Sequence, residues 1–167
     1  MRKRRHFARA ALGVALAFFL GTGLGNNAGL SGPASADSGG AVTERLEIVS
    51  GERTIALDVE IADTASRQAV GLMYRTDLPE GRGMLFIHDA PRELTMWMRN
   101  TYIPLDMVFI RADGTVHRIE AMTEPHSEEI IASKGPVTGV LEIAGGAAAR
   151  MGLKPGDTVR HRHFKGP

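Results

Sequence analysis

The sequence predicts a mostly β protein, a compact single-domain sandwich or barrel-like sheet with one or two short helices. Three observations lead to this fold class. Apolar and polar residues alternate with a period of two over much of the chain. Short apolar runs are separated by turn pairs such as Asp113-Gly114 and Pro155-Gly156. No repeat and no second composition regime divides residues 44–161, which are therefore expected to form one β-rich domain.

Residues 1–36 have the features of a cleaved signal peptide and are set apart from the fold. A basic start precedes an apolar stretch from Ala10 to Leu20, and Ala34-Ser35-Ala36 is a small-residue cleavage site. The apolar stretch is shorter than the ~20 residues of a spanning helix, which favours cleavage near Ala36 over anchoring. Lys3 to Arg9 also resembles a twin-arginine signal, with an ordinary Sec signal as the alternative. We expect a periplasmic or secreted protein that meets the membrane only transiently, through this peptide.

Removal of the signal peptide changes the charge of the protein. The whole chain has 20 Lys and Arg against 19 Asp and Glu. Five of the basic residues and none of the acidic ones lie in the signal peptide, so the mature chain has 15 against 19, a net charge of −4. A mildly acidic domain is not expected to bind nucleic acid. The basic tail, residues 162–167, is expected to be solvated.

The elements of the domain follow a leader, residues 37–43, which is rich in Ser and Gly and expected to be flexible. The strict alternation from Ile55 to Ile61 predicts a half-buried strand. Asp63 or Thr64 would cap a short helix that runs through Gln68 and Met73. Further strands are predicted at Met84–Ile87, Leu94–Arg99, Leu105–Ile110, Val116–Ala121, Val137–Ile143 and Asp157–His161.

Two local signals connect the later elements. Asp113-Gly114 predicts a hairpin that joins the strand ending at Ile110 to the strand beginning at Val116. Ala147 to Met151 is expected to form a single helical turn that Gly152 ends.

Four motifs spread over the mature chain resemble those of the domain of unknown function 192 family. They are Gly71-Leu72-Met73-Tyr74-Arg75, Gly83-Met84-Leu85-Phe86, Trp97-Met98-Arg99-Asn100-Thr101-x-Ile103-Pro104-Leu105-Asp106 and Val140-Leu141-Glu142. The resemblance runs from about Glu44 to about Val159. Met96 stands where this family commonly has Phe, and Arg99 where it commonly has Lys, so both departures keep the chemical class. The resemblance implies a small β-rich, frequently exported protein with no established activity.

Asp106 is the first candidate catalytic residue. It lies in an apolar run typical of a central strand, where a carboxylate must be paired, hydrogen-bonded or protonated. It would orient a ligand or act as a general acid or base. Alternatively it accepts backbone amides of the bend from Asn100 to Pro104, or pairs with Arg99 or Arg75.

Glu142 is the second candidate, because Val140 and Ala144 would share its face and give it a partly apolar environment. Together with Asp106 it would form an acid/base pair of the glycosidase kind, provided that both carboxyl groups face one cleft. A solvent-exposed glutamate at a sheet edge is the alternative.

A candidate ligand-binding set surrounds these carboxylates: Arg75, Trp97, Arg99, Asn100, Thr101 and Asp106. Trp97 would stack on a flat ligand, and the two arginines would bind a carboxylate or phosphate. The alternatives are a core tryptophan, internal ion pairs to Asp77 or Asp106, and a turn held by Asn100 and Thr101.

Other chemistries have little support in the sequence. The absence of cysteine excludes disulfides, thiolate zinc sites and cysteine nucleophiles. His88, His117 and His126 are dispersed without a metal-binding spacing, and no serine nucleophile motif occurs. We therefore expect no metal and no cofactor.

Two classes of function remain. The first is a ligand-binding or interaction module of the periplasm, with a small molecule or an envelope protein as its partner. The second is a small hydrolase or transferase that uses Asp106 and Glu142 on envelope material. The absence of a catalytic motif favours the first.

Overall fold

A computed structural model describes residues 43–166, which lie within one compact unit. The signal peptide and all but the last residue of the leader are outside the described residues. Nine elements follow one another along this part of the chain. They are β1 (Thr43–Ser50), β2 (Arg53–Ala62), α1 (Ala65–Val70), β3 (Arg82–Met96), β4 (Leu105–Ile110), β5 (Val116–Glu120), β6 (Ile131–Ala144), α2 (Ala147–Met151) and β7 (Thr158–Arg160).

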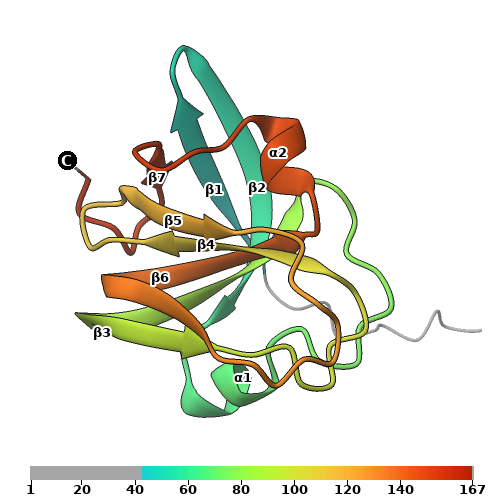
Figure 1. Cartoon of the computed structure of the whole chain (residues 1–167). Coiled ribbons are helices and arrows are strands. Elements are labelled where there is room, and N and C mark those ends of the chain that lie inside the picture. Colours follow the sequence, from blue (N-terminus) through green and yellow to red (C-terminus); the bar gives the residue numbers. More distant parts are fainter. Residues whose placement is uncertain (1–42, 167) are drawn as a thin grey trace, which may run out of the picture. The chain divides into compact units, whose positions relative to one another are not determined.

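The strands form a single sheet that curls into a barrel (Figure 1). Their order is β5-β4-β6-β3-β2-β1-β7. Beyond its pairing with β1, β7 also reaches the β4–β5 hairpin, where the Val159 N–H donates to the Gly114 carbonyl oxygen at 2.7 Å. Gly114 has φ +86°, and a Cβ there would lie 2.4 Å from the Val159 carbonyl oxygen, so this closure requires glycine. The predicted barrel-like, mostly β fold with two short helices is confirmed.

A helical crossover connects β2 to β3. These two strands pair in parallel, which needs a connection that returns to the same end of the sheet. α1 supplies part of it, beginning at Thr64, whose hydroxyl accepts the Arg67 N–H at 3.3 Å, and ending at Gly71. The helix predicted from Thr64 is thus present but stops before Met73.

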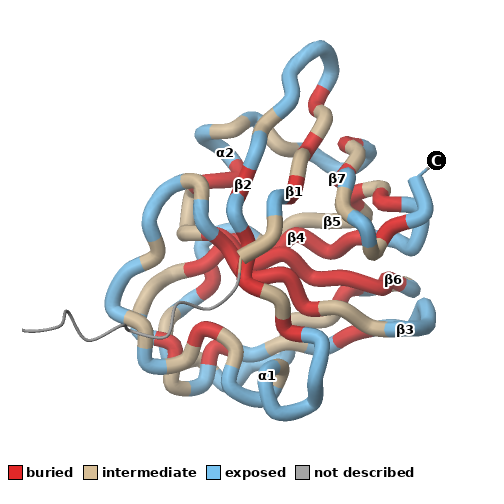
Figure 2. Tube along the Cα trace, turned by 180° about the vertical axis from the view of Figure 1, so that it is seen from behind, coloured by how far each residue is buried: buried red, intermediate tan, exposed pale blue. Residues whose placement is uncertain are grey.

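The sheet carries a separate hydrophobic core on each face. Every strand contributes to the first, inside the barrel, through residues such as Leu46, Leu85 and Leu141. The second lies on the outer face, where residues such as Phe86 and Met107 are covered by the crossover and by the loop after β3. β2, β3, β4 and β6 contribute residues to both cores, and Figure 2 shows buried residues along β4 and β6.

Four details differ from the sequence-based expectations. The predicted strands Met84–Ile87 and Leu94–Arg99 are the two ends of β3, which has bulges between them and stops at Met96. β1 was not predicted, and it includes Thr43, the last residue of the leader. The expected solvated tail was wrong for Phe164, which is 7% exposed and packs into the inner core. Arg162 in the same tail forms two 2.6 Å hydrogen bonds to Glu44 of β1.

Candidate ligand-binding site

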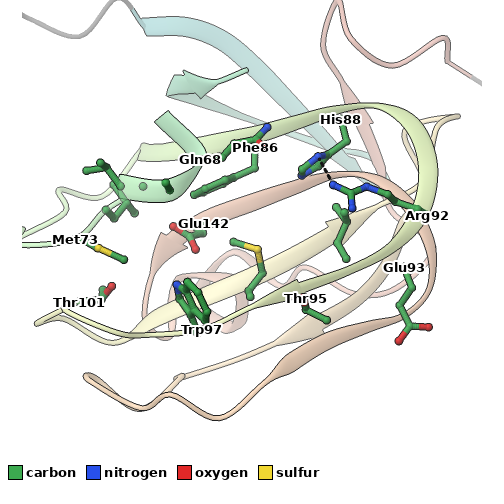
Figure 3. Close-up of a pocket in the computed structure, with 16 residues that line it drawn as sticks. Gln68, Met73, Phe86, His88, Arg92, Glu93, Thr95, Trp97, Thr101 and Glu142 are labelled. Carbon is green, nitrogen blue, oxygen red and sulfur yellow. Dashed lines mark hydrogen bonds between the residues drawn. The ribbon is translucent and has the colours of Figure 1, made fainter. Parts of the chain in front are cut away.

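The outer core contains a cavity between the crossover and the segment after β3, which we call the outer-face pocket (Figure 3). Its volume is about 260 Å³, just below the usual range of ligand sites, about 300–1,000 Å³. It is therefore sized for a small molecule. Residues of α1 and the following turn, of β3, of the segment after β3 and of β6 form its walls: Gln68, Leu72, Met73, Phe86, His88, Arg92, Met96, Trp97, Thr101 and Glu142, among others.

Glu142 differs from the other groups in this pocket because it is a buried acid without a partner. It lies within β6, opposite Met84 of β3 and Met107 of β4, and is only 4% exposed. No donor among residues 43–166 bonds to its carboxyl group, and burial raises the pKa of Glu142 to about 8. The group is therefore mainly a neutral carboxylic acid at pH 7. Buried polar groups normally have hydrogen-bond partners, so this position is a candidate for contact with a ligand.

Aromatic and thioether side chains surround the carboxyl group of Glu142. Figure 3 shows it facing the space bounded by Met73, Phe86 and Trp97. Trp97 is 45% exposed and stands at the rim. The backbone of Gly71 packs against the ring of Phe86: a Cβ at this position would lie 2.9 Å from Phe86 Cζ. Gly71 also has a φ of +49°, which favours glycine. The glycine that ends α1 thus allows the crossover to approach this wall.

The other end of the outer-face pocket is polar and lies on β3. Arg92 Nη2 donates to His88 Nδ1 at 3.2 Å. Burial, and secondarily the positive charge of Arg92, lower the pKa of His88, so its ring is neutral at pH 7. The pocket therefore has an uncharged acid at one end and the guanidinium of Arg92 at the other.

Asp106 is not part of this pocket. Its β4 position pairs with Ile143 of β6, the neighbour of Glu142, so the two carboxylates point to opposite faces of the sheet. Asp106 is 0% exposed and accepts three backbone N–H groups, those of Met122 at 2.8 Å, Gly146 at 2.9 Å and Ala148 at 2.8 Å.

These contacts tie the start of α2 and the loop after β5 to β4. The alternative of a structural acceptor therefore holds for Asp106, although the amides differ from those of the expected bend. Because the acid/base pair required one shared cleft, the arrangement contradicts that hypothesis.

Arg75 also has an internal partner. It forms a bidentate pair with Glu60 of β2, with both N–O distances at 2.7 Å. The alternative of an internal ion pair therefore holds, although neither expected acid, Asp77 or Asp106, is the partner. A second cavity, of about 460 Å³, adjoins this ion pair and shares Gly71 with the outer-face pocket. Arg75 is thus beside the candidate site but outside its walls.

The remaining predicted residues hold the segment after β3 in place. The Arg99 guanidinium lies 4.6 Å from the centroid of the Trp97 ring. Asn100, at φ +58°, donates to the Tyr74 hydroxyl at 3.1 Å, and its carbonyl accepts the Tyr74 N–H at 2.8 Å. Thr101 lines the outer-face pocket. Two of the predicted ligand-binding residues, Trp97 and Thr101, thus line one cavity together with the catalytic candidate Glu142. Arg99 and Asn100 support the segment beside it.

Most of the pocket walls were missed from sequence. Gln68, Leu72, Phe86 and Met96 resemble ordinary core and helix residues, and only the folding of the crossover over β3 brings them together. The sequence did contain one signal of the pocket: Glu142 is a charged residue within the otherwise apolar run from Val140 to Ile143.

No cluster of three or more metal-binding side chains of the His, Cys, Asp or Glu type is found among residues 43–166. None of the helices in this part of the chain is long and apolar enough to span a membrane.

The described part of the chain is thus a small β-barrel protein with a second core and a pocket on its outer face. It belongs to the DUF192 family, described as Uncharacterized ACR, whose family model matches residues 46–161. Among proteins of curated function no match is found.

Two solved structures are similar to this chain. The first is a candidate transcription regulator from Sinorhizobium meliloti 1021, 44% identical, with a TM-score of 0.69; the match covers 71% of this chain and 92% of that one. The second is a protein of unknown function from Novosphingobium aromaticivorans DSM 12444, 38% identical, with a TM-score of 0.71; the match covers 84% of this chain and 100% of that one.

Proposed function

We propose that this protein is an exported binding module that holds a small, mainly apolar ligand in the outer-face pocket, with Glu142 as the polar anchor. One observation carries the proposal: Glu142, a residue that is 4% exposed, has a carboxyl group without a partner within residues 43–166 that faces a cavity of about 260 Å³. Apolar walls with a single polar group of this kind are typical of ligand sites. The proposed location, in the periplasm or outside the cell, is supported by the signal-like residues 1–36 alone.

The enzymatic alternative has lost its main support. The predicted enzyme would use Asp106 and Glu142 as an acid/base pair on one substrate, and the two side chains point to opposite faces of the sheet. A role in transcription, suggested by the description of the Sinorhizobium relative, has no matching feature either. The helices found among residues 43–166 have six and five residues, and the mature chain carries a net charge of −4.

A thermal-shift screen tests the proposal. The barrel lies within residues 43–166 and the match covers 92% of the solved Sinorhizobium chain, so a protein beginning at Asp37 contains the whole domain. It is screened against sugars, nucleotides, amino acids, amines and peptidoglycan fragments. A ligand at ten times its Kd stabilises the native state by about 1.4 kcal/mol, which raises the Tm by about 5 °C for a domain of this size.

Two matched variants locate the binding. Ala69 of α1 lines the outer-face pocket, and Ala65, one turn earlier on the same exposed helix, does not. Ala69→Phe fills the cavity and is expected to abolish the thermal shift, whereas Ala65→Phe retains it. A ligand that stabilises both variants equally binds elsewhere and contradicts the proposed site. The route of export is tested separately: Arg4→Lys with Arg5→Lys blocks a twin-arginine route and leaves a Sec route intact, so unchanged export of this variant contradicts the twin-arginine route.

A further inference from the structure

We propose that the ligand of the outer-face pocket carries an organic cation, a small quaternary or substituted ammonium group, which binds beside Glu142 between Trp97, Phe86 and Met73. This inference rests on the proposed function, because it assigns a ligand class to the same pocket.

The first support is an unbalanced acid. Four carboxylates are buried among residues 43–166: Glu60, Asp106, Glu142 and Asp157. Glu60 and Asp157 each pair with a basic side chain, at 2.7 and 2.8 Å, and Asp106 accepts three backbone N–H groups. Only Glu142 in this set has no partner. A buried carboxylate is stable in its charged form only with a partner, so a positively charged ligand would give the ionised form of Glu142 the partner that the protein provides for the other three.

The second support is the chemistry of the walls. Trp97 and Phe86 present aromatic rings, and Met73 a polarizable thioether, around the carboxyl group (Figure 3). Aromatic rings with a carboxylate are the usual surroundings of a quaternary ammonium ion, because the ring faces attract a cation that ordinary hydrogen bonds do not reach. The Trp97 ring already accepts one cation, the Arg99 guanidinium at 4.6 Å. Arg99 is not among the residues that line the cavity, and the lining at this end includes no other basic side chain.

The proposal has a consequence that separates this ligand class from a neutral one, a linkage between binding and protonation. A cation favours the ionised form of Glu142, so its binding releases a proton and strengthens as the pH rises toward 8. A neutral ligand that accepts a hydrogen bond from the protonated acid binds more weakly over the same interval.

The titratable and charged groups that face the same cavity are His88, Arg92 and Glu93, all on β3. α1, the turn after it and the segment from Trp97 to Thr101 contribute none to the lining. Burial is the cause of the raised pKa of Glu142, so the pH dependence is expected to follow that residue.

The experiment uses a matched pair of probes, choline and its uncharged isostere 3,3-dimethyl-1-butanol. Because Trp97 is the only tryptophan in the chain, its fluorescence reports occupancy of the pocket directly. Titrations at pH 6, 7 and 8.5 are made with the wild type, with Glu142→Gln and with Glu128→Gln. The last changes the charge equally at an exposed position outside the cavity.

We expect choline to bind at least about tenfold more tightly than the alcohol, because only choline carries a positive charge that the Glu142 carboxylate and the aromatic ring faces attract. The preference is expected to grow with pH, to be lost in Glu142→Gln and to be retained in Glu128→Gln. Equal binding of the two probes overturns the ammonium inference and leaves the binding module intact. The ammonium inference is likewise overturned, and the binding module kept, if neither probe binds while a neutral ligand stabilises Ala65→Phe but not Ala69→Phe. Failure of every ligand overturns the proposed function itself.

Discussion

Replacement of Asp106 by Asn is expected to destabilise the protein strongly without abolishing ligand binding in the outer-face pocket. An Asn side chain has one accepting oxygen. It keeps the two N–H groups that bond to Oδ1, from Met122 and Gly146, but turns its own NH₂ group toward the Ala148 N–H. One charge-assisted hydrogen bond is lost and a buried donor faces a donor, since Asp106 is 0% exposed. We expect a loss of about 3 kcal/mol in the free energy of unfolding.

This loss corresponds to a large change in melting temperature. The entropy of unfolding is about 2.1 cal/mol/K per residue, or about 0.26 kcal/mol/K for a domain of this length, so the Tm is expected to fall by about 11 °C. Calorimetry and urea unfolding measure both quantities, and an unchanged m value would show that the native state is still compact.

The control is Asp113→Asn in the β4–β5 hairpin. Asp113 is exposed and accepts a single backbone N–H, from Thr115 at 2.9 Å, which an Asn can accept equally well. Its Tm is expected to stay within about 2 °C of the wild type. If Asp106→Asn were as stable as this control, the three amide contacts would not hold the fold as described. If it were stable and also lost ligand binding, Asp106 would belong to the site after all.

Three further predictions concern other parts of the molecule. Burial raises the pKa of Glu142 to about 8 from 4.5, so the native state binds the extra proton between these values and stability falls as the pH rises through them. Glu142→Gln should remove up to about 1.4 kcal/mol of this loss per pH unit, and identical pH slopes in urea unfolding would contradict the burial of the acid. Phe164→Ala should lose about 3 kcal/mol, measured against Tyr102→Ala at a 46% exposed position; equal losses would place the tail outside the core. Arg75→Ala leaves the buried Glu60 unpaired and should lower the free energy of unfolding by about 3 kcal/mol. Adding Glu60→Gln should restore part of this loss, and simple additivity of the two changes would argue against the ion pair.

The sequence predicted best what is decided locally. β4 runs from Leu105 to Ile110 as expected, because five apolar residues and Asp106 stand between Pro104 and the Asp113-Gly114 turn, a run typical of a strand that is buried on both faces. α2 likewise matches Ala147 to Met151. β1 was missed although Leu46 and Ile48 alternate correctly, since charged neighbours and the adjoining Ser/Gly-rich leader obscure the pattern.

The candidate site depended on information that the sequence does not carry. Both acids were correctly expected in apolar strands, but which face each one occupies is set by the register of β4 against β6. Asp106 lies opposite Ile143; a register one residue different would place it opposite Glu142, with both side chains on one face. The pocket itself forms where residues 68–73, 94–101 and 142 meet, a long-range contact that no local pattern predicts.

The closure of the barrel by β7 also determines when this protein can fold. Val159, which bonds to the β4–β5 hairpin, and Phe164, which packs into the inner core, leave the ribosome after the six other strands. Until they emerge, β1 has no partner on one side and the sheet remains open at both edges. Such edges pair readily with other chains, so the nascent protein passes through an aggregation-prone interval that lasts until β7 and Phe164 have emerged.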